Sequence, residues 1–84
     1  MHPDFERSAL IDRIVRGATE PDLVRLHGAI VAALELYGRD DAVRRVFVPA
    51  LARVRREHGR PGRDIAAAAI GDQLRLDRYQ SPSP

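Results

Sequence analysis

A chain of 84 residues can bury one hydrophobic core and is too short for a second domain. It contains no cysteine, which excludes disulfide bonds and thiolate metal sites and favours a reducing, cytoplasmic setting. The formal net charge is +2, and every one of the 14 basic residues is arginine, a bias typical of a GC-rich coding sequence. The N-terminus lacks a basic and apolar leader, and no apolar run reaches about 18 residues, so we expect neither a secretory signal nor a membrane span.

The spacing of the apolar residues predicts an all-α fold, a single four-helix bundle over residues 1–80. Alanine, leucine and arginine dominate, apolar residues recur three and four positions apart, and glycine and proline cluster between these stretches. We expect the first helix to run from Asp4, as its N-cap, to Arg16, with Gly17 ending it. Residues 81–84, which contain only serine and proline, are expected to form a disordered tail.

The second predicted helix has the clearest boundaries. Thr19 offers a capping hydroxyl, Pro21 suits the first turn, and Gly38 ends the helix. Its apolar stripe is unusually wide, because Val24 and Val31 lie beside the main seam. Such a helix is either buried on two sides or offers an apolar patch to a partner, and we favour burial.

A third helix is expected to begin at Asp40 or Asp41 and to end at His58. Pro49 lies inside it, and an interior proline removes one backbone hydrogen bond and clashes with the preceding turn. We therefore predict that this helix is kinked or split at Pro49.

A loop from Gly59 to Arg63 is expected to lead into the fourth helix. Asp64 is its predicted N-cap and Tyr79 its approximate end. Alanines at positions 66–69 would let another helix approach closely, and the short connections suit antiparallel neighbours in a bundle.

The reactive side chains argue against an enzyme. Hydroxyl groups are few, and that of Thr19 is accounted for by helix capping. The three histidines lie far apart, and none has the i, i+4 partner that zinc-binding helices use. The segment from Gly59 to Arg63 matches neither a P-loop nor a dinucleotide fingerprint. We therefore predict no catalytic residue, no metal site and no cofactor.

Arginines occupy one face of the third predicted helix, opposite its apolar stripe. At 100° per residue no acidic residue falls among them, and Glu57 lies on the other side. Such a face can dock on an acidic protein or on phosphates, although a solvated outer face has the same pattern. Base-specific recognition of nucleic acid is not expected, because aromatic residues are few and no recognition-helix turn is evident. The face comprises Arg44, Arg45, Arg53, Arg55 and Arg56.

One segment carries a resemblance to a known family. The run Val46-Phe47-Val48-Pro49-Ala50-Leu51-Ala52-Arg53-Val54, followed by Asp64-Ile65-Ala66, resembles the helical cap domain that precedes the cobalamin-binding domain of MerR-type light-responsive regulators and cobalamin-dependent methyltransferases. The resemblance extends from Ile11 to Tyr79 and implies a regulatory four-helix bundle that forms protein contacts. The tryptophan and the Glu-His pair that cover cobalamin in the family fall on His58, Ala68 and Ala69, so the cofactor-facing side chains are lost.

Three functional hypotheses follow. The leading one is a non-catalytic interaction module of bacterial transcriptional or signalling control, whose partner is another protein or a second copy of the chain. It would bind through the arginine face or through Val24 and Val31. The second is a small-molecule sensor with a pocket at one end of the bundle, lined by His58, Ala68 and Ala69. The third is nucleic-acid binding through the arginine face.

Overall fold

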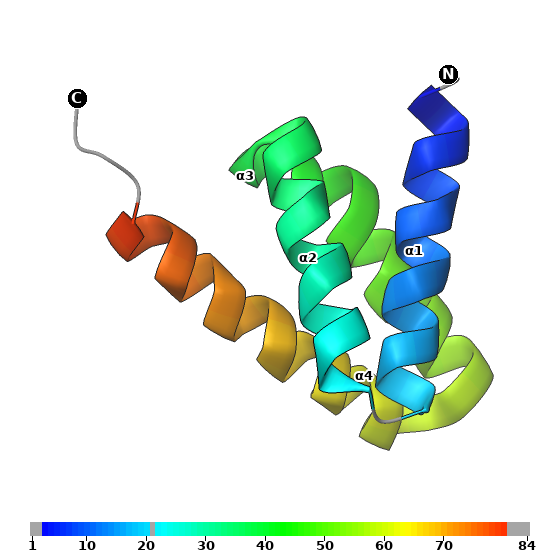
Figure 1. Ribbon diagram of the computed structural model, residues 1–84. Helices are drawn as coiled ribbons and strands as arrows, with labels where there is room; N and C mark the ends of the chain where they lie inside the picture. Colours follow the sequence, from blue (N-terminus) through cyan, green and yellow to red (C-terminus); the bar gives the residue numbers. More distant parts are fainter. Residues whose placement is uncertain (1–2, 21, 81–84) are drawn as a thin grey trace.

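The structure, a computed structural model, describes residues 3–20 and 22–80, with side chains for residues 6–20 and 22–77 (Figure 1). These residues form helices and contain no strand, which confirms the all-α prediction. In chain order the elements are α1 (Pro3–Thr19), α2 (Leu23–Tyr37), α3 (Arg39–Ala42), the π-helical η1 (Val43–Phe47) and α4 (Val48–Gln80).

The prediction of four separate helices is not confirmed, because α3, η1 and α4 follow one another without a loop. The backbone leaves the helical region inside α4 only at Gly59, with φ 81° and ψ −171°. The sharp change of direction therefore lies ten residues after Pro49, and the predicted split at Pro49 is wrong.

A π-helical turn takes the place of the expected break at Pro49. The Val48 N–H donates to the carbonyl of Val43, five residues back, so the helix is widened just before the proline. In an α-helix the proline ring would press on the carbonyl of Arg45, four residues back. The wider turn keeps the chain helical past Pro49.

Three of the predicted boundaries of the first two helices are wrong. Helix α1 already includes Asp4 and continues through Gly17 to Thr19, whose hydroxyl donates to the carbonyl of Val15 at 2.9 Å. The N-cap of α2 is Asp22, whose carboxylate accepts the Arg25 N–H at 3.0 Å. Pro21, expected in the first turn, lies outside the described residues.

The later boundaries also differ in part. Gly38 ends α2 as predicted and immediately precedes α3, so Asp40 and Asp41 lie in the first turn of α3 and are not caps. After Gly59 the chain is helical again at once, which places Asp64 inside α4 and removes the predicted loop. The expected tail, residues 81–84, lies outside the described residues.

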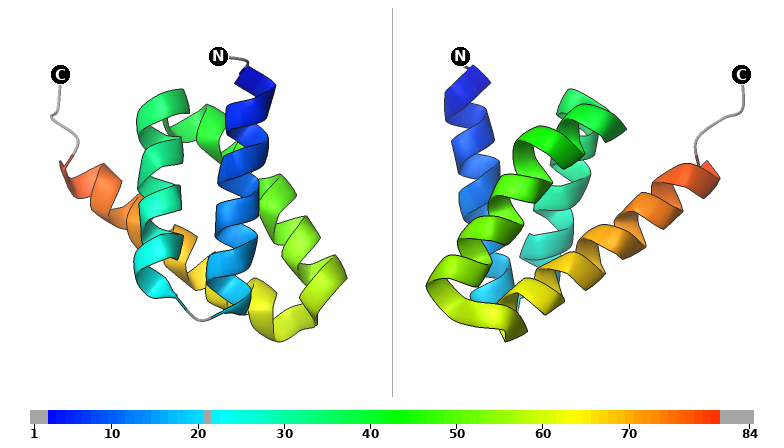
Figure 2. Two further views of the ribbon diagram at one scale, coloured as in Figure 1. Left: turned by 45° about the vertical axis from the view of Figure 1, so that its right-hand side comes forward. Right: turned by 180° about the vertical axis from the view of Figure 1, so that it is seen from behind.

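The helices pack in two layers. Helices α1 and α2 lie side by side in front, and the path of α3, η1 and the first part of α4 lies behind them (Figure 1). Beyond Gly59 the second part of α4 passes behind α2, and its last turns diverge from the body (Figure 2). None of the described helices is long and apolar enough to cross a membrane.

The core lies between the layers and confirms most of the predicted apolar stripes. Helical spacing in the sequence also assigns Leu23, Ile65 and Leu76 to these stripes, but the structure leaves these three side chains exposed. No polar or charged side chain among the described residues is buried in the core. The core side chains, each at most 5% exposed, are Leu10, Ile14, Val15, Ala18, Leu26, Ala29, Ile30, Ala33, Ala42, Val46, Phe47, Ala50, Val54, Ala66, Ala69 and Ile70.

Candidate interaction surfaces

The arginine face is less uniform than its spacing suggests. Arg53 donates hydrogen bonds to Asp12 of α1 and to Glu57 at 2.6 Å, so it joins α4 to α1. These hydrogen bonds, first that to Asp12, raise the pKa of Arg53 above its ordinary value. Arg44 is paired with Asp41 at 2.8 Å. The prediction that no acid falls among the arginines is therefore wrong.

Three of the predicted arginines remain unpaired. Within the described residues Arg45, Arg55 and Arg56 are exposed and have no acidic partner within salt-bridge distance. Val48, which is 56% exposed, and Ala52 lie at helical spacing between them. We call these five residues the basic face: an apolar centre with a guanidinium on either side.

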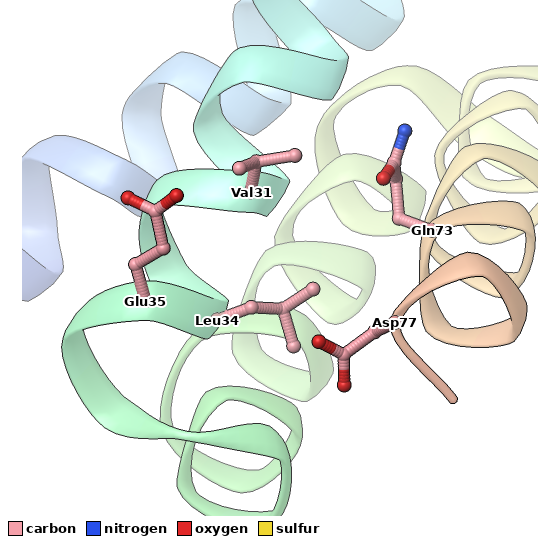
Figure 3. A pocket seen from close by; sticks show the side chains of 5 residues that line it. All are labelled: Val31, Leu34, Glu35, Gln73 and Asp77. Atoms are coloured by element: carbon pink, nitrogen blue, oxygen red, sulfur yellow. The ribbon is translucent and has the colours of Figure 1, made fainter. Parts of the chain in front are cut away.

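A groove separates α2 from the last part of α4 (Figure 3). Val31 and Leu34 of α2 form its apolar wall, and Leu34 points toward Asp77 of α4 across it. Glu35 and Gln73 complete the lining, and the hollow measures about 250 Å³. We call these five residues the α2–α4 groove; it presents an apolar surface beside two carboxylates.

An ion pair at the edge of the groove ties α4 to α3. Arg39 lies 3.8 Å from the Asp77 carboxylate and donates to the carbonyl of Leu74 at 2.9 Å. Both charged side chains are more than two-fifths exposed, so this pair is screened by water and weak. Asp77 therefore keeps much of its negative charge available to a partner.

The outer flank of α2 is exposed rather than buried. Val24 is 85% exposed and Val31 is 37% exposed. The prediction that α2 is buried on two sides is therefore wrong at Val24. The two valines are seven residues apart, on the same side of α2. Because Val31 also lines the α2–α4 groove, the flank and the groove form one continuous surface.

The structure does not bring together the residues of the expected sensor pocket. His58 lines an open hollow with Thr19, Pro61 and three apolar or small residues near Gly59. Ala69 is buried in the core, Ala68 is exposed, and neither lines this hollow.

A cluster of arginines that the sequence pattern did not reveal lies at the kink of α4. Arg55, Arg60 and Arg63 line a hollow of about 340 Å³. The sequence pattern assigned Arg60 and Arg63 to a loop and Arg55 to a separate helix, so their proximity had no sequence signal. It arises from the reversal of direction at Gly59.

In the described part of the chain no three histidine, acidic or cysteine side chains gather where they could hold a metal ion. No protein-family model, no curated protein and no solved structure matches the chain.

Proposed function

We propose that the protein is a non-catalytic interaction module that binds another protein through the α2–α4 groove. The single observation that carries the proposal is the pairing of an apolar wall with two carboxylates in an open groove. A helix that presents an apolar side chain between basic ones complements such a surface in both shape and charge.

The partner to which we commit is a second copy of this chain. Its basic face has the required chemistry, because Val48 lies between Arg45 on one side and Arg55 and Arg56 on the other. The basic face belongs to η1 and the first part of α4. In Figure 2 this stretch lies on the same side of the molecule as the last part of α4. Two copies related by a twofold axis would each place a basic face in the other's groove, and most homo-oligomers have closed symmetry of this kind.

The proposal includes a regulatory role in bacterial transcriptional or signalling control and a cytoplasmic location. The resemblance to the helical cap domain of cobalamin-binding regulators supports it, as does the absence of cysteine. In this proposal, the two parts of α4 on either side of Gly59 would correspond to the third and fourth helices of such a bundle. Because the cofactor-facing side chains are replaced by His58, Ala68 and Ala69, the proposed module acts without cobalamin.

The test is sedimentation equilibrium from about 10 µM to 1 mM protein. We expect reversible self-association with a Kd on the order of 100 µM, weakened by salt because small, charged interfaces are transient and screened. Glu35→Arg, and separately Arg45→Glu with Arg56→Glu, should each raise the Kd by about tenfold, because each places like charges opposite one another. An equimolar mixture of these two variants should associate again, because the reversed charges are complementary.

The matched control is Arg16→Glu on α1. Arg16 is exposed, lies on neither surface, and undergoes the same charge reversal, so the Kd should change by less than about twofold. A wild-type protein that stays monomeric at 1 mM would overturn the second copy as partner. Equal weakening by Arg16→Glu, or no recovery in the mixture, would overturn the groove as the binding surface.

A further inference from the structure

The kink at Gly59 gathers three positive charges around one hollow. Arg55 comes from the helical stretch before the kink, and Arg60 and Arg63 come from the first turn after it. All three are exposed. We call the hollow that they line, about 340 Å³ in volume, the kink hollow.

These charges are poorly neutralised. In the described part of the chain, Arg55 and Arg60 have no acidic side chain within salt-bridge distance. Arg63 has only Asp64, at 3.5 Å, and the two side chains are 47% and 58% exposed. The interaction energy of such an exposed ion pair is small, so the hollow keeps a net positive charge.

Guanidinium groups that converge in this way favour an oxyanion. Each one presents a planar fork of N–H donors that fits two oxygens of a phosphate group, and it stays charged at every physiological pH. Like charges around an empty hollow repel one another, and a bound dianion turns that repulsion into attraction. Three such forks at one hollow match the several oxygens of a single phosphate group better than they match one carboxylate.

We propose that the kink hollow is a binding site for a phosphate group, carried by inorganic phosphate, by pyrophosphate or by a phosphate monoester. The proposal does not depend on protein association, because Arg60 and Arg63 belong to neither the basic face nor the α2–α4 groove. Arg55 belongs to both the basic face and the hollow, so the decisive variants leave it unchanged.

The experiment is a titration of the protein with inorganic phosphate and with pyrophosphate, followed by NMR signals of the arginine Nε–H groups. Chloride at equal ionic strength serves as the reference. We expect saturable shifts for Arg55, Arg60 and Arg63, with pyrophosphate binding more tightly than phosphate because it carries more charge. Arg60→Gln and Arg63→Gln should each weaken binding by about tenfold, the usual effect of losing a charge-assisted hydrogen bond.

Arg16→Gln is the matched control, since it removes one exposed arginine that lies outside the hollow, the basic face and the α2–α4 groove. It should change the affinity by less than about twofold. Shifts that do not saturate, or that weaken equally in all three variants, would mean diffuse attraction and overturn the site. A short single-stranded oligonucleotide that binds more tightly than pyrophosphate, and that loses as much affinity in Arg16→Gln as in Arg60→Gln, would also overturn it, in favour of a dispersed nucleic-acid surface.

Discussion

At the scale of single residues, two glycines inside helices meet opposite surroundings. A Cβ on Gly17 would lie 2.9 Å from the Cα and Cβ of Leu26 and 3.0 Å from its backbone nitrogen. A Cβ on Gly71 would meet no atom within 4 Å. Gly17 is thus a point of close approach between α1 and α2, although its sequence context suggested a helix end.

We predict opposite effects of alanine at these two glycines. Gly17→Ala should lower the free energy of unfolding by about 1–2 kcal/mol, because forcing two backbones apart costs more than the roughly 1 kcal/mol gained from better helix propensity. Gly71→Ala should raise it by about 0.5–1 kcal/mol, because only the propensity changes. Urea unfolding followed by circular dichroism measures both; equal effects would contradict the close approach of α1 and α2.

The roles of individual arginines also depend on distant neighbours. Helical spacing assigns Arg53 and Arg56 to the same face, but Arg53 is paired with Asp12, which lies 41 positions away in sequence. Helical spacing placed Arg53 on the arginine face, and it could not indicate that α1 supplies an acid beside it. The sequence therefore predicted only part of the candidate surfaces: Arg45, Arg55 and Arg56 are exposed as expected of an outer helix face, whereas Val24 and Val31, for which burial was favoured, are exposed as well.

At the scale of elements, one glycine determines the shape of α4. The backbone of Gly59 has φ 81° and ψ −171°, a region that side chains with a Cβ essentially do not adopt. The nearest atom to a Cβ there is Pro61 Cδ at 3.8 Å, so a substitution would be penalised by backbone strain and not by a clash. A continuous helix through this point would separate Val54 from Ala66, both of which are buried in the same core.

We predict that Gly59→Ala lowers the free energy of unfolding by about 1–3 kcal/mol, the usual strain for such a backbone conformation. The folded state should stay compact, with the Cα radius of gyration near 12.2 Å, because core packing holds the kink closed. Urea unfolding and small-angle X-ray scattering measure the two quantities. An expanded molecule with undiminished helix content would show instead that α4 straightens, and an unchanged stability would contradict the strained conformation.

At the scale of the whole molecule, the helices share one core and should unfold together. Leu26 and Leu36 both lie on α2, but Leu26 is fully buried whereas Leu36 is 56% exposed. Leu26 contacts the α1 backbone near Gly17 and belongs to the cluster that joins both layers.

We predict that Leu26→Ala lowers the free energy of unfolding by about 2–5 kcal/mol, through lost burial and the cavity left behind. Leu36→Ala should change this free energy by less than about 0.5 kcal/mol, since truncating an exposed side chain removes little packing. Urea transitions followed by circular dichroism and by proteolysis should coincide for each variant, as expected of a single cooperative domain. A Leu26→Ala protein that loses only α2 would contradict a shared core.

The sequence alone determined the all-α class, the end of α2 at Gly38 and most core positions, because helical periodicity and glycine conformation are properties of neighbouring residues. Only the tertiary structure decided that Gly17 is a contact, that Gly59 and not Pro49 redirects the chain, and which arginines are paired. The contact at Gly17 and the pair of Arg53 with Asp12 depend on where a second, distant segment lies. The convergence of Arg55, Arg60 and Arg63 follows from the direction that α4 takes after its kink.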